Sequence, residues 1–286
     1  MVGTSTSGRI VWVVVVLLVM AIILFPVYWM VNMSFKSAAE FIAQPPTLIV
    51  KNPTTANYHD LIVTQRFYEY GIHSVIVAVI AATVAVTFGT MGAYGLSRFK
   101  LQRNFNYHIL FTVLTIRMFP PIVTIIPIFV FYNKHYNLFG IDIHLLDTFL
   151  GLGLIHAFSE LPLVIWMMIG FFRDIPRDME EAALVDGDTR FAVMRKIAIP
   201  LARPGLAATF ILVFISSWNE FLYALILTQT KAQTLPIAVA GQITQFDIKW
   251  GNMMAAGVLT TVPVLVLALL AQRHLTRGLA VGGVTG

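Results

Sequence analysis

The sequence lacks cysteine and has few charged residues, and each shortage excludes classes of protein. Without cysteine there are no disulfides, zinc–thiolate sites, iron–sulfur clusters or cysteine nucleophiles. Charged residues make up 12% of the 286 residues, against roughly 25% in soluble domains. So few charges cannot cover a surface that faces water, whereas a surface that faces lipid needs almost none. The chain is therefore predicted to be an integral membrane protein.

Hydrophobic residues make up 58% of the chain and gather in six long stretches. A spanning helix needs roughly 20 mostly apolar residues, and every stretch reaches that length. The first is too long for a signal peptide and has no small-residue cleavage site, so a retained helix is expected. The predicted fold class is an all-α integral membrane protein with six transmembrane helices, at 10–33, 71–96, 105–132, 149–172, 205–228 and 251–271.

The distribution of lysine and arginine predicts the orientation of these spans. Six spans place both termini on one side, and cytoplasmic loops carry an excess of Lys and Arg. With cytoplasmic termini, the inner segments hold 12 of these residues in 62 positions, against 6 in 73 for the outer segments. The predicted domains are a cytoplasmic N-terminus at 1–9, a transmembrane domain of six helices at 10–272 and a cytoplasmic tail at 273–286. The net charge of +5 follows from the positive loops, and no nucleic-acid partner is expected.

Small residues recur at every fourth position of the second stretch. They are Ala81, Ala85, Gly89 and Ala93. Small residues on one face of a membrane helix let a second backbone approach closely. The pattern predicts helix packing rather than chemistry.

Three charged side chains fall near the middle of predicted spans, where an ionised group indicates a functional site by default. One interpretation of Arg117, Glu160 and Glu220 is a polar translocation path or gate that also includes Asn219 and a helix break at Pro120, since transporters use discontinuous helices where substrate binds or passes. The other interpretation is that Arg117 pairs with a glutamate and locks two helices together.

The inner segment at 173–204 is predicted to be a charged helix–turn–helix. Pro176 suits the first turn of one helix, and the Asp-Gly pair at 186–187 ends it. Asp188 or Thr189 is expected to cap the second helix, and Pro200 to close it. The segment is too polar to span a membrane and too regular for a loose loop. It fits either a solvated connector or a docking surface for a soluble partner.

This segment resembles the coupling (EAA) motif of permeases in ATP-binding-cassette importers. The motif reads Glu-Ala-Ala at 181–183, Gly187, and Ile-Ala-Ile-Pro at 197–200, with Ile199 where the family usually has leucine. Residues 161–172 and 218–221 are similar to spans of the carbohydrate-uptake branch. The C-terminus at 271–286 resembles that of the maltose-type subunit, although Thr285 stands where lysine is frequent.

The resemblance implies partners for this chain. They are a second homologous permease subunit, two ATP-binding subunits, and a periplasmic or lipid-anchored solute-binding protein, in the bacterial cytoplasmic (inner) membrane and its lipid. The chain lacks a Gly-x-x-x-x-Gly-Lys-Ser/Thr phosphate loop, so ATP and magnesium are expected on the partner ATPases, with no cofactor or catalytic residue here. The ATPase-coupling residues implied are Glu180, Glu181, Ala182, Ala183, Asp186, Gly187, Ile197 and Pro200.

The outer stretch at 235–252 matches the loop that, in the maltose-type subunit, enters the sugar cleft of the binding protein. Gln242, Thr244 and Gln245 are the candidates for contacts with sugar hydroxyls, and an ordinary surface loop is the alternative. The expected substrate is a sugar or sugar derivative. An unpaired Arg117 would favour an anionic one.

Functions of other classes leave features of this sequence unexplained. An intramembrane enzyme needs converging catalytic groups or metal ligands, and His156, one turn before Glu160, lacks such company. A proton-coupled carrier would use Glu160 and Glu220 as relay groups but leaves the charged inner segment unexplained. An ATP-driven importer of another solute, such as a polyol, shares the coupling motif.

Overall fold

The computed structural model describes residues 6–41, 43–99, 105–138, 141–244 and 248–279, which form two compact units. The first unit comprises residues 1–68 and 238–262. It contains α1 (Thr6–Ser34), α2 (Ala38–Phe41), α3 (Ala56–His59), the π-helical turn η1 (Asp60–Thr64) and the first part of α14 (Trp250–Leu279). The most apolar window of α1 has no residue buried within the described chain, so this helix is suited to contact lipid or another subunit.

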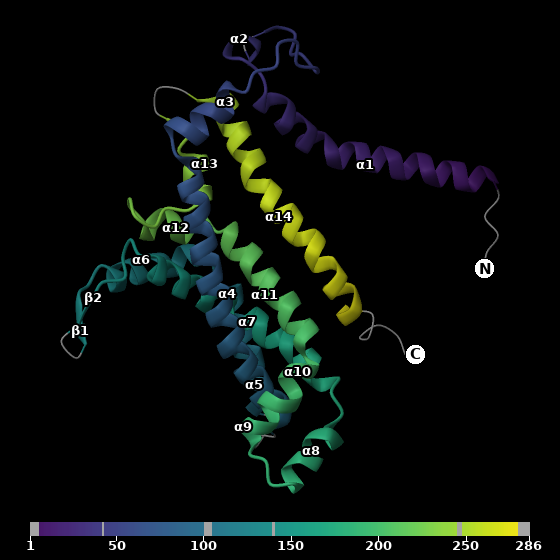
Figure 1. The fold of residues 1–286 in the computed structure, drawn as a ribbon, viewed down its shortest axis with the longest axis vertical. Coiled ribbons are helices and arrows are strands. Elements are labelled where there is room, and N and C mark those ends of the chain that lie inside the picture. Colours follow the sequence, from purple (N-terminus) through teal and green to yellow (C-terminus); the bar gives the residue numbers. More distant parts are fainter. Residues whose placement is uncertain (1–5, 42, 100–104, 139–140, 245–247, 280–286) are drawn as a thin grey trace. The chain divides into compact units, whose positions relative to one another are not determined.

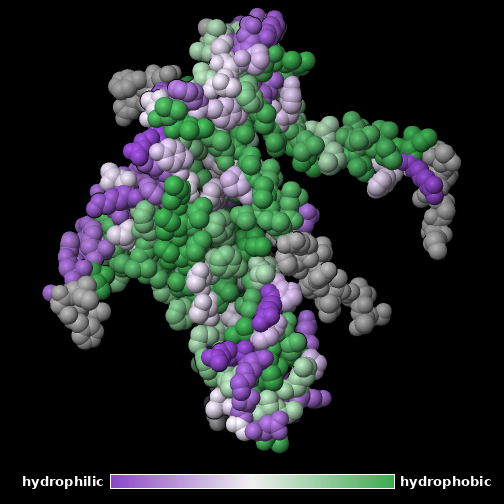
Figure 2. Space-filling model, viewed as in Figure 1, coloured by the Kyte–Doolittle hydropathy of each residue, from purple (hydrophilic) through white to green (hydrophobic). Residues whose placement is uncertain are grey.

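The second unit comprises residues 69–237 and 263–286. In Figure 1 its long helices α4, α7 and α11 run alongside one another. Figure 2 shows apolar side chains over the long helices and polar side chains gathered over α8 and α9. Its elements are α4 (Phe67–Arg98), α5 (Phe105–Met118), α6 (Pro121–Tyr132), β1 (Tyr136–Leu138), β2 (Ile141–Ile143), α7 (Phe149–Arg173), α8 (Arg177–Val185), α9 (Arg190–Val193), η3 (Met194–Ala198), α10 (Ile199–Leu201), α11 (Arg203–Trp218), α12 (Leu222–Leu227) and α13 (Leu235–Ala240).

Four helices of the described chain are long and apolar enough to cross a membrane. They are Gly8–Ser34, Phe67–Arg98, Phe149–Arg173 and Trp250–Leu270. Two bent pairs, α5 with α6 and the segment Arg190–Leu201 with α11, raise the number to six if each pair is one span. The chain is therefore predominantly helical, although the all-α expectation missed a short antiparallel hairpin in which Tyr136 pairs with Ile143.

The small residues of α4 pack against α7, as their spacing predicts. Ala81, Ala85 and Ala93 are fully buried. At Gly89 a β-carbon would lie 2.5 Å from Val164 Cγ1, so only glycine fits beside this valine. The same close approach recurs in reverse on α7, where a β-carbon on Gly153 would lie 2.6 Å from Ile80 Cγ2 on α4. Small residues on both helices therefore set the distance between α4 and α7.

The third stretch breaks at the proline pair. Residues 119–120 separate α5 from α6, and the two helix axes differ by 89°. Pro121 takes the first position of α6, where its missing N–H is no loss, and the helix then continues through Pro127. The stretch at 105–132, expected as one distorted span, is thus two helices.

The fifth stretch is also interrupted, and the expectation of one helix at 205–228 is wrong. α11 ends at Trp218 and α12 begins at Leu222. No proline or glycine lies at 219–221. The break follows instead from the side-chain contacts of Glu220.

Asp147 joins the loop before α7 to the loop after α12. Its carboxylate accepts hydrogen bonds from the backbone N–H groups of residues 229–232, at 3.0 to 3.3 Å, and its own N–H donates to Leu227 O at 2.9 Å. Burial opposes ionisation of this carboxyl, but the backbone donors outweigh it and lower the pKa of Asp147 below its usual 3.8. The ionised form is therefore what holds the two loops together.

Candidate functional site

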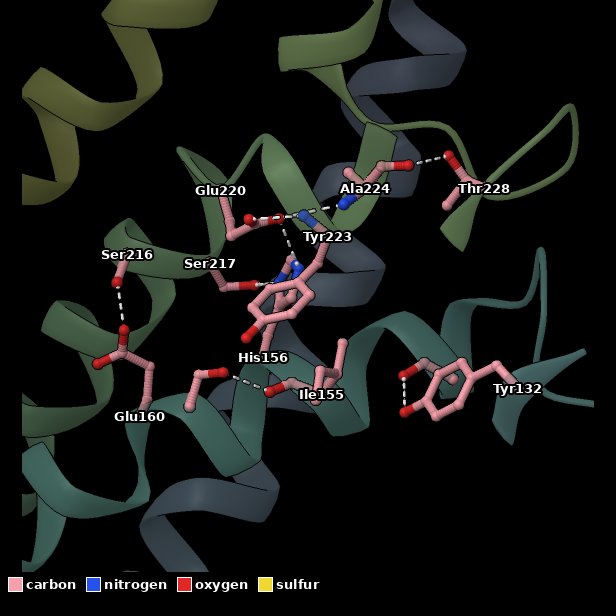
Figure 3. Close-up of polar contacts among 12 residues, drawn as sticks. Tyr132, Ile155, His156, Glu160, Ser216, Ser217, Glu220, Tyr223, Ala224 and Thr228 are labelled. Carbon is pink, nitrogen blue, oxygen red and sulfur yellow. Dashed lines mark hydrogen bonds and ion pairs between the residues drawn. The ribbon is translucent and has the colours of Figure 1, made fainter. Parts of the chain in front are cut away.

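Charged and polar side chains from three helices meet within the second unit. Arg117, at the end of α5, places Nη1 at 3.1 Å from Glu160 Oε2 on α7. Ser216 of α11 donates its hydroxyl to the other oxygen, Glu160 Oε1, at 2.5 Å (Figure 3). Of the two interpretations of Arg117, the structure brings it together with a glutamate, and that glutamate is Glu160.

The pair neutralises its own charges. The Glu160 side chain is 12% exposed and the Arg117 side chain 42% exposed, so the arginine is the member that remains partly accessible. Because both carboxylate oxygens of Glu160 are engaged, neither charge of the pair is left without a partner. Such a site presents hydrogen-bonding groups without presenting a net charge.

Glu220 caps the helix that follows the break in the fifth stretch. Its Oε1 accepts from the backbone N–H of Tyr223 at 2.8 Å, and its Oε2 from that of Ala224 at 3.2 Å. The first N–H groups of a helix have no partner within it, and broken helices at membrane depth require protein groups to supply one. Glu220 therefore satisfies two backbone N–H groups at the start of α12.

His156 is buried beside this cap. Its Nδ1 lies 2.7 Å from the hydroxyl of Ser217. Its Nε2 lies 3.1 Å from Glu220 Oε2, which is within ion-pair distance, but the two atoms do not have the geometry of a hydrogen bond. In Figure 3 dashed lines join the imidazole to Ser217 and to Glu220. His156 thus links α7 to the junction of α11 and α12. Among the described residues, no group of three or more metal-ligating side chains comes together.

The other predicted path residues lie at the two breaks. Pro120 separates α5 from α6, and Asn219 is exposed with its amide donating to Ile215 O of its own helix at 2.8 Å. Thr124 Oγ1 of α6 lies 3.4 Å from the hydroxyl of Tyr223 on α12, so the helices that follow the two breaks contact each other. Sequence reasoning missed the partner side chains, which are Thr124, Ser216, Ser217 and Tyr223.

The segment that resembles the coupling motif contains two helices joined by a turn. Gly187, between α8 and α9, has a φ of +94°, a conformation that favours glycine. Of the two expected caps, Thr189 is the one used, accepting from Ala192 N at 3.2 Å. The expectation that Pro200 closes the second helix is not met. The helix continues to Leu201 and bends before α11.

The motif residues differ sharply in burial. Glu181, Ala182, Asp186 and Gly187 are exposed, whereas Ala183, Ile197 and Pro200 are half-buried. Glu180 is the one buried residue of α8, with 3% of its side chain exposed. It binds Arg98 of α4 through the guanidinium at 2.7 and 2.9 Å. Glu180 is therefore engaged inside the chain and is not free to contact a partner, contrary to the expectation.

The predicted sugar-contacting residues lie in the first unit and are not equivalent. Gln242 is 5% exposed, and its amide donates to Gln65 Oε1 at 2.8 Å and to Ala238 O at 3.1 Å. Its side chain is therefore committed to the base of the loop, and the expectation of a sugar contact is wrong for this residue. Thr244 is exposed, and Gln245 lies outside the described residues.

Gln242 belongs to a network that includes a carboxylate. Asp60 Oδ2 accepts from Gln65 Nε2 at 2.9 Å and from Asn252 Nδ2 at 2.6 Å. The hydrogen bond from Gln65, which outweighs partial burial, lowers the pKa of Asp60. The network joins η1, the base of the 243–248 loop and the start of α14, all within the first unit.

Comparison with known proteins assigns a family. The family model described as the inner membrane component of binding-protein-dependent transport systems matches residues 85–281. The trehalose transport system permease protein of Mycobacterium tuberculosis is 36% identical over 96% of this chain and 97% of that protein. The trehalose/maltose transport system permease protein of Thermococcus litoralis is 32% identical over 97% of each.

A solved structure agrees in fold. One chain of a bacterial ABC transporter involved in the import of the acidic polysaccharide alginate matches with a TM-score of 0.76, over 96% of this chain and 99% of that one, at 22% identity. The family model covers well over half of the sequence, and the two permeases span nearly all of it. The chain therefore belongs to the family of inner membrane components of binding-protein-dependent transport systems, as a multi-pass permease subunit of an ABC importer.

Proposed function

We propose that this chain is one of two homologous permease subunits that form the passage of a sugar importer in the bacterial cytoplasmic membrane. A solute-binding protein delivers the sugar from outside, and two ATP-binding subunits dock beneath and hydrolyse ATP with magnesium. The bent pair of α5 and α6 counts as one span and α11 with α12 as another, which with the four long helices gives six spans with both termini in the cytoplasm. That orientation agrees with the excess of Lys and Arg in the inner segments.

The observation that carries the proposal is the state of α8. The helix exposes Glu181 and Ala182 to solvent, while the adjacent residue of the same helix, Glu180, forms a buried ion pair with Arg98 of α4. A helix that is fastened to the body and exposes an acid beside small residues is suited to enter a cleft in a partner. Glu181 then meets a basic residue of the ATP-binding subunit, and the helix–turn–helix at 173–204 acts as the coupling loop.

The substrate is proposed to be an uncharged sugar. Two relatives that span nearly all of this chain are named for trehalose and maltose, which are neutral disaccharides. The pairing of Arg117 with Glu160 removes the reason to expect an anionic one. The partly exposed guanidinium and the exposed amide of Asn219 remain as donors for hydroxyl groups.

Proton-coupled transport has less support. A relay carboxylate needs to gain and lose a proton during each cycle. Both oxygens of Glu160 and both oxygens of Glu220 already accept hydrogen bonds within the chain. ATP hydrolysis by partner subunits is the energy source that fits an exposed α8.

The test is the ATPase activity of the purified complex in lipid, titrated with binding protein and a panel of neutral and anionic sugars. We expect one neutral sugar to stimulate hydrolysis, Glu181→Ala to abolish the stimulation, and Asp188→Asn, which removes an exposed pair with Lys196, to preserve it. Uptake that continues without ATP, or a preparation with no associated ATPase, would overturn the proposal. Stimulation by anionic sugars alone would overturn the substrate class.

A further inference from the structure

The way in which α8 is attached to the rest of the second unit is unusual. Helices normally bury an apolar face, but the residue that α8 buries is a glutamate. Met179 and Val185, its large apolar residues besides Leu184, are exposed at 48% and 87%. The helix is therefore attached to α4 by polar contacts, with Glu180 as its buried member, rather than by a buried apolar face.

These contacts form a closed network at the end of α4. Glu180 Oε1 accepts from Arg98 Nε at 2.9 Å and from Arg98 Nη2 at 2.7 Å, and Glu180 Oε2 accepts from the Tyr94 hydroxyl at 2.9 Å. Nη2 also donates to Ile175 O at 3.3 Å, in the link between α7 and α8. The Arg98 and Glu180 side chains are 4% and 3% exposed.

A third helix is held by the same network. The Tyr94 ring meets Phe172 of α7 edge-on, with centroids 5.4 Å apart. A second cross-link runs the other way, from Arg177 Nη2 of α8 to Ser97 O of α4, at 3.3 Å. The ends of α4 and α7 and the start of α8 are thus connected by an ion pair, hydrogen bonds and a ring contact.

The burial of Arg98 and Glu180 makes this ion pair costly to open. Opening the pair would leave two charges uncompensated away from water, which is strongly unfavourable. The same segment contains a contrasting pair, Lys196 with Asp188 at 2.7 Å, whose side chains are 57% and 31% exposed. Exposed pairs of this kind exchange readily with water and contribute little.

We propose that Glu180, Arg98 and Tyr94 form a clamp that makes α8 move together with α4. The inference rests on the proposed function, in which a partner ATPase displaces α8. With the clamp closed, the displacement is carried into α4 and, through Tyr94 and Phe172, into α7. With the clamp open, residues 174–176 bend, α8 follows the partner alone, and hydrolysis is uncoupled from transport. Glu180 and Arg98 are positioning residues that contact neither the partner nor the substrate.

The first experiment measures the clamp directly. The chain contains no cysteine, so Met91→Cys on α4 and Val185→Cys on α8, both exposed positions, give a single pair of spin labels in this chain, in a complex assembled with partner subunits whose accessible cysteines have been replaced. We expect one narrow distance distribution, unchanged between nucleotide-free and ATP-trapped states. Glu180→Ala is expected to broaden it, whereas Lys196→Ala is not. A distribution in Glu180→Ala as narrow as in the control would overturn the clamp.

The second experiment measures coupling in proteoliposomes, as sugar imported per ATP hydrolysed. We expect Glu180→Ala to lower this ratio by about tenfold while hydrolysis continues, a size within the usual range of coupling between sites. Glu180→Gln, which keeps the side-chain volume, is measured alongside in case the alanine variant does not assemble. An unchanged ratio in the Gln variant and the Lys196→Ala control alike would refute the inference. Absence of sugar-stimulated hydrolysis in the unaltered complex would instead refute the proposed function.

Discussion

The close approach of α4 and α7 makes opposite predictions for two glycines on the same helix. Gly89 faces α7, and a β-carbon there would lie 2.5 Å from Val164 Cγ1 and 2.7 Å from Val164 Cβ. Gly95, six residues further along, has no atom of a described residue, apart from its own helix backbone, within 4 Å of where its β-carbon would be. Gly89→Ala should therefore destabilise the protein, whereas Gly95→Ala should not.

The magnitude follows from the contact distances. Non-bonded carbons prefer separations of about 3.5 to 4.0 Å, so the new methyl group overlaps Val164 by about 1 Å. Val164 is fully buried and branched at its β-carbon, so it has no free rotamer to move into. Overpacking of this kind costs about 1–3 kcal/mol. Replacing glycine with alanine within a helix stabilises the folded protein by about 0.5–1 kcal/mol. At Gly95 only this stabilising contribution remains.

The assay is thermal unfolding of the purified protein in detergent, with unaltered protein, both alanine variants, and Gly89→Ala combined with Val164→Ala. We expect Gly89→Ala to unfold at a lower temperature than the unaltered protein, and Gly95→Ala at the same temperature or a higher one. Val164→Ala should recover part of the loss in the Gly89→Ala background, since it removes Cγ1, the nearest overlapping atom, and leaves only Cβ. Equal unfolding temperatures for the two single variants, or no recovery in the double variant, would refute the packing argument.

Three further predictions concern the polar contacts. Arg117→Gln should lower sugar uptake about tenfold because it leaves Glu160 without its cation. The double variant Arg117→Gln with Glu160→Gln should recover much of the lost uptake, since removing both charges avoids an uncompensated one. Lower uptake by the double variant than by Arg117→Gln alone would contradict this reasoning. Gln242→Leu should raise the binding-protein concentration needed for half-maximal ATPase stimulation with little change in maximal rate, because it releases the loop base from its neighbours; a lower maximal rate alone would count against it. The pKa of Asp147 is lowered in the folded protein, so its stabilising contribution is complete above pH 3.8 and is lost as the pH falls through the lower folded-state pKa. The free energy of unfolding of Asp147→Asn, measured from pH 7 to pH 3, should lack this acid-dependent loss. A pH profile identical to that of the unaltered protein would rule out this role of Asp147.

The sequence predicted the parts of this structure that depend on local composition. The apolar stretches located every long helix, and the proline pair at 120–121 indicated the break between α5 and α6. The four-residue spacing of small residues predicted the packed face of α4. In each case the physical cause lies within one turn or one span of the chain.

The rest depended on contacts between distant residues. The break before α12 has no proline or glycine to indicate it in the sequence. It is stabilised instead by the cap from Glu220 and by the neighbouring His156, 64 positions earlier. Nothing in the adjacent pair Glu180 and Glu181 indicates which one is buried, since the difference arises from Arg98, 82 positions away. Gln242 looked like a sugar ligand because its partner Gln65 is 177 positions away.

The unequal exposure of two neighbouring glutamates has a consequence for chemical footprinting. A water-soluble carbodiimide reacts with carboxylates that solvent can reach, so Glu181 of α8 should be modified in the isolated chain and Glu180, with 3% of its side chain exposed, should be spared. When a partner covers α8, only the Glu181 signal should fall. The two carboxylates then lie within one proteolytic peptide, one reporting occupancy and the other the integrity of the fold.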